Sequence, residues 1–121
     1  MGKSVKTVAI IQARMTSTRL PGKVVLPVCN RPMISILLER LSLSKTLDQI
    51  VVATPDSAIN NPIIEIVRSQ GFSIFQGNER DVLDRYLQAA KQNNADVIVR
   101  ITADCPLIDP LIVDEVVKKF F

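Results

Sequence analysis

The sequence contains no histidine, and this absence excludes several kinds of site. Without histidine the chain cannot build a Ser-His-Asp triad, a Cys-His pair or a His-ligated metal centre. Its two cysteines, Cys29 and Cys105, lie far apart and lack metal-ligand spacing. We therefore expect free thiols in a reducing compartment, and a cytoplasmic protein. Aromatic residues are too few (4%) and too scattered to form a stacking platform, so no nucleic-acid partner is expected.

Long apolar runs are also absent. No run reaches the roughly 18 residues of a membrane-spanning segment, and the basic start is a poor signal peptide, so no membrane partner is expected. The chain is nevertheless 47% hydrophobic and 22% charged, which excludes a disordered tail. Its 121 residues suit one unit, residues 1–121, with a core that needs no disulfide.

The charge is divided unevenly along the chain. Residues 1–50 hold eight Lys or Arg and two acids, a net charge of +6. Residues 51–121 hold seven Lys or Arg and ten acids, a net charge of −3. No acid precedes Glu39, so the early cations have no sequence-local partners. Such a segment is either a solvated basic face or a surface that attracts an anion.

Apolar β-branched runs alternate with helical patterns. The runs predict strands over residues 5–12, 49–53, 72–75 and 96–102, and helices beginning at Pro32, Asn61, Glu79 and Asp109. Buried strands separated by helices favour an α/β fold with a parallel sheet covered on both faces. Ligands in such sheets bind beyond the carboxyl ends of the strands. In the helix from Glu79 we expect the inward side chains to be Val82, Leu83, Tyr86, Leu87 and Ala90.

A cationic loop, residues 12–23, follows the first predicted strand. It places Arg14, Arg19 and Lys23 among hydroxyl groups and a Pro-Gly turn, although it matches neither a Walker A loop nor GxGxxG. Arginine can bind two phosphate oxygens at once, and loop N–H groups can bind others. The loop is therefore a candidate polyphosphate cradle, and its alternative interpretation is an ordinary basic surface.

Acidic residues near the other strand ends have two interpretations each. Asp104 follows the strand 96–102 and could hold Mg²⁺ together with phosphate oxygens, or could cap a turn. Asp81 and Arg85 have the spacing of an ion pair on a helix, and could instead lie near a nucleotide. Asp109 is typical of a helix start, and we expect Asp114 to be a solvated helix charge.

Three stretches together resemble one family. They are IIQARMTSTRLPGKVVLPVCNRPMI, GNERDVLDRYLQAA and VRITADCPLIDP. In this order they resemble the cytidylyltransferase family of sugar-activating nucleotidyltransferases. The similarity is greatest to the spore coat polysaccharide biosynthesis protein F group, whose relatives are the acylneuraminate and 3-deoxy-manno-octulosonate cytidylyltransferases.

The resemblance implies a Rossmann-like nucleotide-diphospho-sugar transferase fold, three α/β/α layers with strand order 3-2-1-4 in this half. It implies transfer of a nucleotidyl group from CTP to a sugar or sugar acid, with release of pyrophosphate, in surface or spore-coat polysaccharide biosynthesis. Arg14 and Lys23 would be catalytic and Asp104 would bind Mg²⁺. The implied nucleotide-binding residues are Ala13, Arg14, Ser17, Arg19, Lys23, Asp81 and Arg100.

Members of this family are longer than this chain. The resemblance implies that the sugar pocket, a second metal-binding acid and the region forming a homodimer belong to the other half. Residues 1–121 would then be the nucleotide-binding, amino-terminal part of a truncated nucleotidyltransferase domain. The alternative hypothesis is a non-catalytic nucleotide-binding or oligomerising remnant of such an enzyme.

Overall fold

The computed structural model describes residues 5–15, 25, 27–28, 31–103 and 109–120. Its strands are β1 (Thr7–Gln12), β2 (Pro27–Val28), β3 (Arg31–Pro32), β4 (Gln49–Pro55), β5 (Ser73–Gly77) and β6 (Val97–Thr102). Its helices are α1 (Met33–Leu41), the 3₁₀ turn η2 (Ala58–Asn60), α2 (Asn61–Ser69), α3 (Val82–Gln92) and α4 (Pro110–Phe120). Strands and helices alternate as predicted, and the small antiparallel pair β2–β3 was not predicted.

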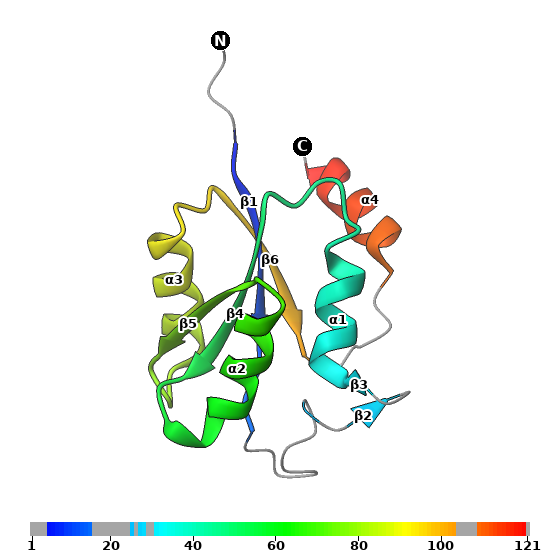
Figure 1. The fold of residues 1–121 in the computed structure, drawn as a ribbon. Coiled ribbons are helices and arrows are strands. Elements are labelled where there is room, and N and C mark those ends of the chain that lie inside the picture. Colours follow the sequence, from blue (N-terminus) through cyan, green and yellow to red (C-terminus); the bar gives the residue numbers. More distant parts are fainter. Residues whose placement is uncertain (1–4, 16–24, 26, 29–30, 104–108, 121) are drawn as a thin grey trace.

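Four parallel strands form the sheet, in the order β5-β4-β1-β6 (Figure 1). This order confirms the predicted 3-2-1-4 arrangement. The register places Gln12 of β1 beside Ala53 of β4 and Thr102 of β6. The carboxyl ends of the inner strands β4 and β1 and of the edge strand β6 therefore lie side by side, at the bottom of Figure 1.

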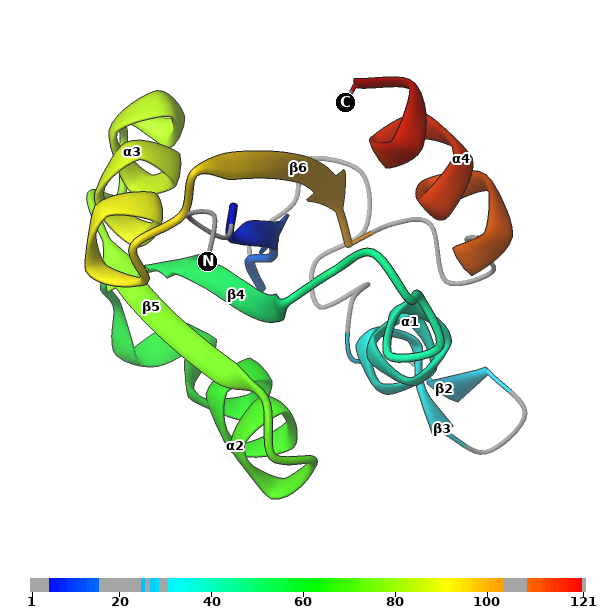
Figure 2. The same cartoon turned by 90° about the horizontal axis from the view of Figure 1, so that it is seen from above.

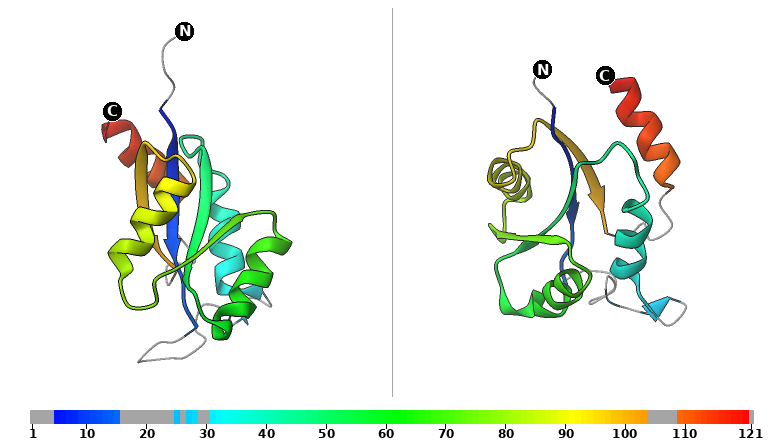
Figure 3. Two further views of the ribbon diagram at one scale, coloured as in Figure 1. Left: turned by 90° about the vertical axis from the view of Figure 1, so that its left-hand side faces the viewer. Right: turned by 45° about the horizontal axis from the view of Figure 1, so that its top comes forward.

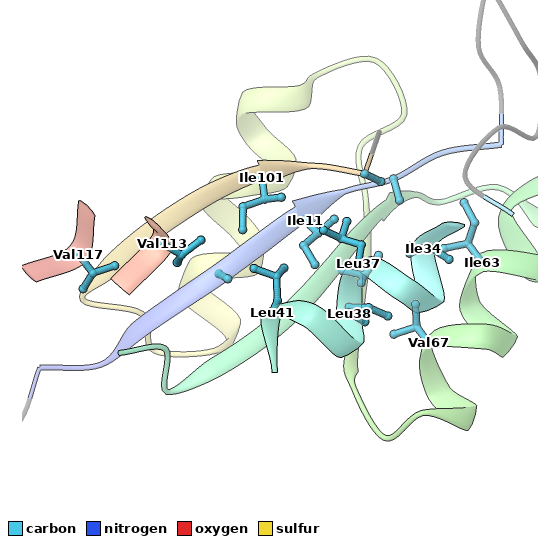
Figure 4. Close-up of a cluster of buried hydrophobic side chains, with 14 residues drawn as sticks. Ile11, Ile34, Leu37, Leu38, Leu41, Ile63, Val67, Ile101, Val113 and Val117 are labelled. Carbon is cyan, nitrogen blue, oxygen red and sulfur yellow. The ribbon is translucent and has the colours of Figure 1, made fainter. Parts of the chain in front are cut away.

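Alternate side chains of β1 enter two separate cores, because successive residues of a strand point to opposite faces. Ala9 and Ile11 pack with α1, α2 and α4, and Val8 and Ile10 pack with α3. Figure 4 shows the first cluster, with Ile11 and Ile101 of the sheet facing the helices. Figure 2 and Figure 3 show the same layers, with α3 on one face and the other three helices on the opposite face. The chain is thus the predicted three-layer α/β fold.

The inward face of α3 differs from the predicted one. Leu83 and Leu87 are 73% and 48% exposed, while Arg85 is 1% exposed. The buried positions follow helical spacing from the half-buried Val82, through Arg85 and Tyr86 to Ala89 and Ala90. Apolar character alone selected the two leucines wrongly, since they lie about 100° round the helix from that face.

Helix α4 lies beside β6, the strand at the edge of the sheet. It buries Val113 and Val117 and exposes four large apolar side chains. These exposed residues are Leu111, Ile112, Val116 and Phe120. An exposed apolar face of this kind is typical of a surface that packs against further polypeptide.

Asp114 joins α4 to the segment before β4. Its carboxylate accepts hydrogen bonds from the hydroxyls of Ser44 (2.5 Å) and Thr46 (2.6 Å), and from the backbone N–H groups of Lys45 and Thr46 (both 3.1 Å). The Ser44 and Thr46 hydroxyls, more than the backbone groups, hold the pKa of Asp114 well below its ordinary value. The expectation of a solvated charge was therefore wrong, because this carboxylate is buried and fully bonded.

None of the helices in the described residues is both long and apolar enough to cross a membrane.

Candidate nucleotide-binding site

The first candidate residues follow the central strand β1 at the carboxyl edge of the sheet. Ala13 is 2% exposed and its N–H donates to the carbonyl of Ala53 (3.1 Å), which extends the strand ladder by one residue. Arg14 follows and is exposed. On the other side of β1, the N–H of Ala103 donates to the carbonyl of Gln12 (3.1 Å). Arg14 therefore leaves the sheet between β4 and β6.

The structure describes four of the eight predicted site residues. Ala13 and Arg14 lie at the end of β1, Asp81 lies immediately before α3, and Arg100 lies in β6. Ser17, Arg19, Lys23 and Asp104 lie outside the described residues. Their predicted roles therefore remain predictions.

Asp81 begins helix α3. Its Oδ1 accepts a hydrogen bond from the N–H of Asp84 (3.0 Å), the usual contact of an N-cap carboxylate. No ion pair joins Asp81 to Arg85 among the described residues, so the spacing that suggested one does not produce it. Asp81 is exposed, and both its charge and that of Arg14 act on Arg85.

Arg100 points toward α3. It pairs with Ile10 in the sheet, two residues before β6 ends. Its guanidinium carbon lies 4.4 Å from the centre of the Tyr86 ring, in a cation–π contact. Because Tyr86 is buried and follows Arg85 directly, this contact places Arg100 on the α3 face and near the Arg85 segment.

The sequence left Arg85 with two interpretations, an ion pair with Asp81 or a position near a nucleotide. Its Nη1 donates to the carbonyls of Asn78 (2.7 Å) and Glu79 (3.2 Å), in the turn between β5 and α3. Its buried Nε and Nη2 have no hydrogen-bond partner in the part of the chain that the structure describes. Burial, and secondarily the positive charge of Arg14, lowers the pKa of Arg85. Because the spacing to Asp81 alone suggested a surface ion pair, Arg85 was not among the binding residues that the resemblance implied.

The turn that Arg85 supports is closely bonded. Oδ1 of Asn78 accepts from the N–H groups of Arg80 (2.9 Å) and Asp81 (3.0 Å), and the carbonyl of Gly77 accepts from the N–H of Asp56 (2.8 Å). A Cβ on Gly77 would lie 3.1 Å from Cγ of Arg85. Glycine therefore lets the Arg85 side chain lie across the end of β5.

Asn60 holds the start of the first loop. Its buried side chain accepts from the N–H of Met15 (2.8 Å) and donates to the carbonyl of Pro55 (3.1 Å). The segment after Arg14 is thereby fixed to the end of β4. The sequence indicated only a helix start here, because Asn61-Pro62 is typical of one.

The described residues contain no cluster of metal-binding side chains. They hold no group of three or more Cys, Asp or Glu side chains able to bind a metal ion. Mg²⁺ usually takes one or two carboxylates and completes its shell with phosphate oxygens and waters. Asp104, the residue predicted to bind Mg²⁺, lies outside the described residues, so its role stays a prediction.

These features give the carboxyl edge of the sheet a positive charge. Arg14 and Arg85 interact as like charges at the ends of neighbouring elements, and the hydrogen-bonded turn 77–81 adjoins them. Neither cation forms an ion pair with a described carboxylate, although the charge of Asp81 acts on Arg85, and two such cations favour an oxyanion such as phosphate. The position agrees with the rule that ligands bind beyond the carboxyl ends of parallel strands.

Comparison with known sequences identifies the family of this chain. A cytidylyltransferase family model matches residues 8–121. An uncharacterized protein of Methanocaldococcus jannaschii is 48% identical over 93% of this chain and 46% of its own length. Spore coat polysaccharide biosynthesis protein SpsF of Bacillus subtilis is 39% identical over 93% of this chain and 48% of its own. The chain thus spans about half the length of these curated relatives.

Solved structures agree with this assignment. A cytidylyltransferase from Leptospira borgpetersenii superposes with a TM-score of 0.93 and 46% identity, over 97% of this chain and 49% of that one. A CMP:2-keto-3-deoxy-manno-octonic acid synthetase complexed with CTP gives 0.82 and 27%, over 95% and 47%. A more distant neighbour from Mycobacterium tuberculosis, 16% identical with a TM-score of 0.68 over 95% and 59%, was solved with manganese. The chain belongs to the cytidylyltransferase family.

Proposed function

We propose that this chain is the CTP-binding part of an enzyme that transfers a cytidylyl group to a sugar or sugar acid and releases pyrophosphate. The observation that carries the proposal is the exposed Arg14 at the carboxyl end of the central strand, in a chain that the family model covers from residue 8 onward. The similarity to a synthetase solved with CTP supports the choice of nucleotide.

Each predicted residue receives a role in this proposal. Arg14, Arg19 and Lys23 bind the triphosphate, with Ser17 offering a hydroxyl, and Arg14 and Lys23 stabilise the charge of the departing pyrophosphate. Ala13 and the turn before α3, with Asp81, lie beside the nucleoside. Arg100 supports that side through Tyr86. Asp104 would hold Mg²⁺ against the phosphates, where the ion would neutralise negative charge.

The broader setting follows from the same family resemblance. The acceptor is a sugar used in a surface or spore-coat polysaccharide, and the enzyme works in the cytoplasm as a homodimer. No nucleic acid and no membrane takes part. Residues 1–121 form the amino-terminal part of the nucleotidyltransferase domain.

Nucleotide binding is tested by titration calorimetry of CTP in the presence of Mg²⁺. We expect saturable binding, weakened by Arg14→Ala and by Asp104→Ala. Arg68→Ala is the matched control, since Arg68 is exposed in the last turn of α2, which begins near the end of β4 and runs back along the sheet. Absence of CTP binding to the natural sequence, or equal losses in all three variants, would contradict the proposal.

The second candidate function is a non-catalytic nucleotide-binding or oligomerising module. It is favoured by the exposed apolar residues of α4 beside the edge strand β6. It predicts CTP binding or self-association without pyrophosphate release. A coupled pyrophosphate assay with CTP and candidate sugar acids distinguishes the two, because CTP- and sugar-dependent release would exclude the non-catalytic module.

A further inference from the structure

The guanidinium of Arg85 is bonded on one side only. Nη1 donates to two carbonyls of the turn, so this nitrogen has hydrogen-bond partners. Nε and Nη2 are also buried and have no partner among the described residues. These two nitrogens carry the parallel N–H bonds of one guanidinium edge, the edge that matches two oxygens of a phosphate or carboxylate.

No described group neutralises this charge at close range. Asp81 is the carboxylate whose charge acts favourably on Arg85, but its Oδ1 accepts from the N–H of Asp84 and it makes no ion pair. The positive charge of Arg14 is repulsive toward Arg85. A buried cation with unpaired donors is costly, and in a natural fold such a group calls for a further partner, such as a water, an ion or a ligand.

The end of β5 and the following turn hold the Arg85 side chain in place. Gly77 leaves room for Cγ of Arg85 against the end of β5, and the Nη1 contacts fix the turn around it. The unpaired edge is therefore positioned before any ligand arrives. Small side-chain rearrangements on binding are common, and one is required here because both free nitrogens are closed off from solvent.

We infer that the Nε–Nη2 edge of Arg85 binds two oxygens of a phosphate group, with Arg14 contacting the same group from the end of β1. This inference rests on the proposed nucleotide binding and adds a residue to it. The phosphate belongs to the triphosphate of CTP, so inorganic tripolyphosphate should use the same residue and cytidine should not.

Affinity measurements on charge-matched variants test the inference. Arg85→Lys keeps the charge and loses the two-donor edge, and Arg85→Met removes the charge while keeping most of the length. We expect CTP and tripolyphosphate to bind about 10- to 100-fold more weakly to both, the range for losing a charge-assisted hydrogen bond. Cytidine affinity should stay within about twofold. Arg68→Lys and Arg68→Met serve as controls.

A measurement on the natural sequence avoids any failure of the variants to fold. The Nε–H resonance of Arg85, assigned through the side-chain carbons of Arg85 in the isotope-labelled natural sequence, should shift and exchange more slowly with water when tripolyphosphate is added. An unchanged resonance at saturating tripolyphosphate would overturn the inference, as would CTP affinity that depends on Arg14 and not on Arg85.

The outcomes separate this inference from the proposed function. Tripolyphosphate binding that depends on Arg85, without CTP binding, would remove the nucleotide proposal and leave the anion site. Equal losses for cytidine and CTP would show that Arg85 acts only by holding the turn 77–81, and would remove the phosphate contact.

Discussion

Replacing Gly77 by alanine tests how the end of β5 positions Arg85. The added Cβ would lie 2.6 Å from Cε2 of Phe75 and 3.1 Å from Cγ of Arg85. The first distance is shorter than van der Waals contact, so the Phe75 ring must move, and the second requires Arg85 to shift slightly. The substitution therefore disturbs the buried guanidinium without changing any charged group.

Two opposing effects set the size of the change. Overpacking of this kind costs about 1–3 kcal/mol. Alanine also restricts the unfolded chain and so stabilises the fold by about 0.4–1 kcal/mol where its backbone angles suit it. We expect Gly77→Ala to lower the free energy of unfolding by a net ~0.5–2 kcal/mol. CTP affinity should fall as well, because Arg85 moves.

Denaturant unfolding and CTP titration measure the two effects. Adding Phe75→Leu to Gly77→Ala removes the nearest clash, so the double variant should lose less stability than the two single variants together. Gly71→Ala is the control, since Gly71 has φ +83° and nothing within 4 Å of a Cβ. It should lose stability through backbone strain and keep CTP affinity. A Gly77→Ala protein with unchanged stability and affinity would refute the reasoning.

Two further predictions concern the segments that frame the site. Asn60→Ala leaves the Met15 N–H and the Pro55 carbonyl without their side-chain partner, so it should lower the free energy of unfolding by about 1–3 kcal/mol and weaken CTP binding, whereas Asn61→Ala, at an exposed neighbour, should do neither. Asp114 has a lowered pKa in the fold, so its contribution to stability is present above the ordinary aspartate pKa of about 3.9 and is lost as the pH falls below it. Asp114→Asn should be less stable at neutral pH and should lose less stability than the natural sequence between pH ~5 and ~2; identical pH profiles of unfolding for the two proteins would contradict this.

The sequence predicted the architecture well because buried strands carry a strong local signal. The run TVAIIQ is apolar on both faces, as expected of a central parallel strand, and β1 indeed lies between β4 and β6. The end of α2 was also predictable, since Gly71 adopts the positive φ that follows many helices.

The site was predictable only in part, because packing within the fold decides which polar groups are buried. The Asp81–Arg85 spacing has a local explanation, yet Asp81 caps α3 and Arg85 turns inward toward the carbonyls of Asn78 and Glu79. Asn60 bonds to Met15, which is 45 residues away in the chain. The inward turn of Arg85 and the Asn60–Met15 contact cannot be found by periodicity or by spacing along the chain.

The central claim is that the phosphates of CTP bind at the carboxyl edge of the sheet, between the first loop and the turn before α3. A crystal structure of the chain with CTP and Mn²⁺ tests it most directly, because anomalous scattering locates the ion independently of the nucleotide. The account predicts a triphosphate in contact with Arg14 and Arg85, and a manganese peak at the carboxylate of Asp104. A triphosphate bound at the opposite edge, near Arg68 or Asp96, would contradict it.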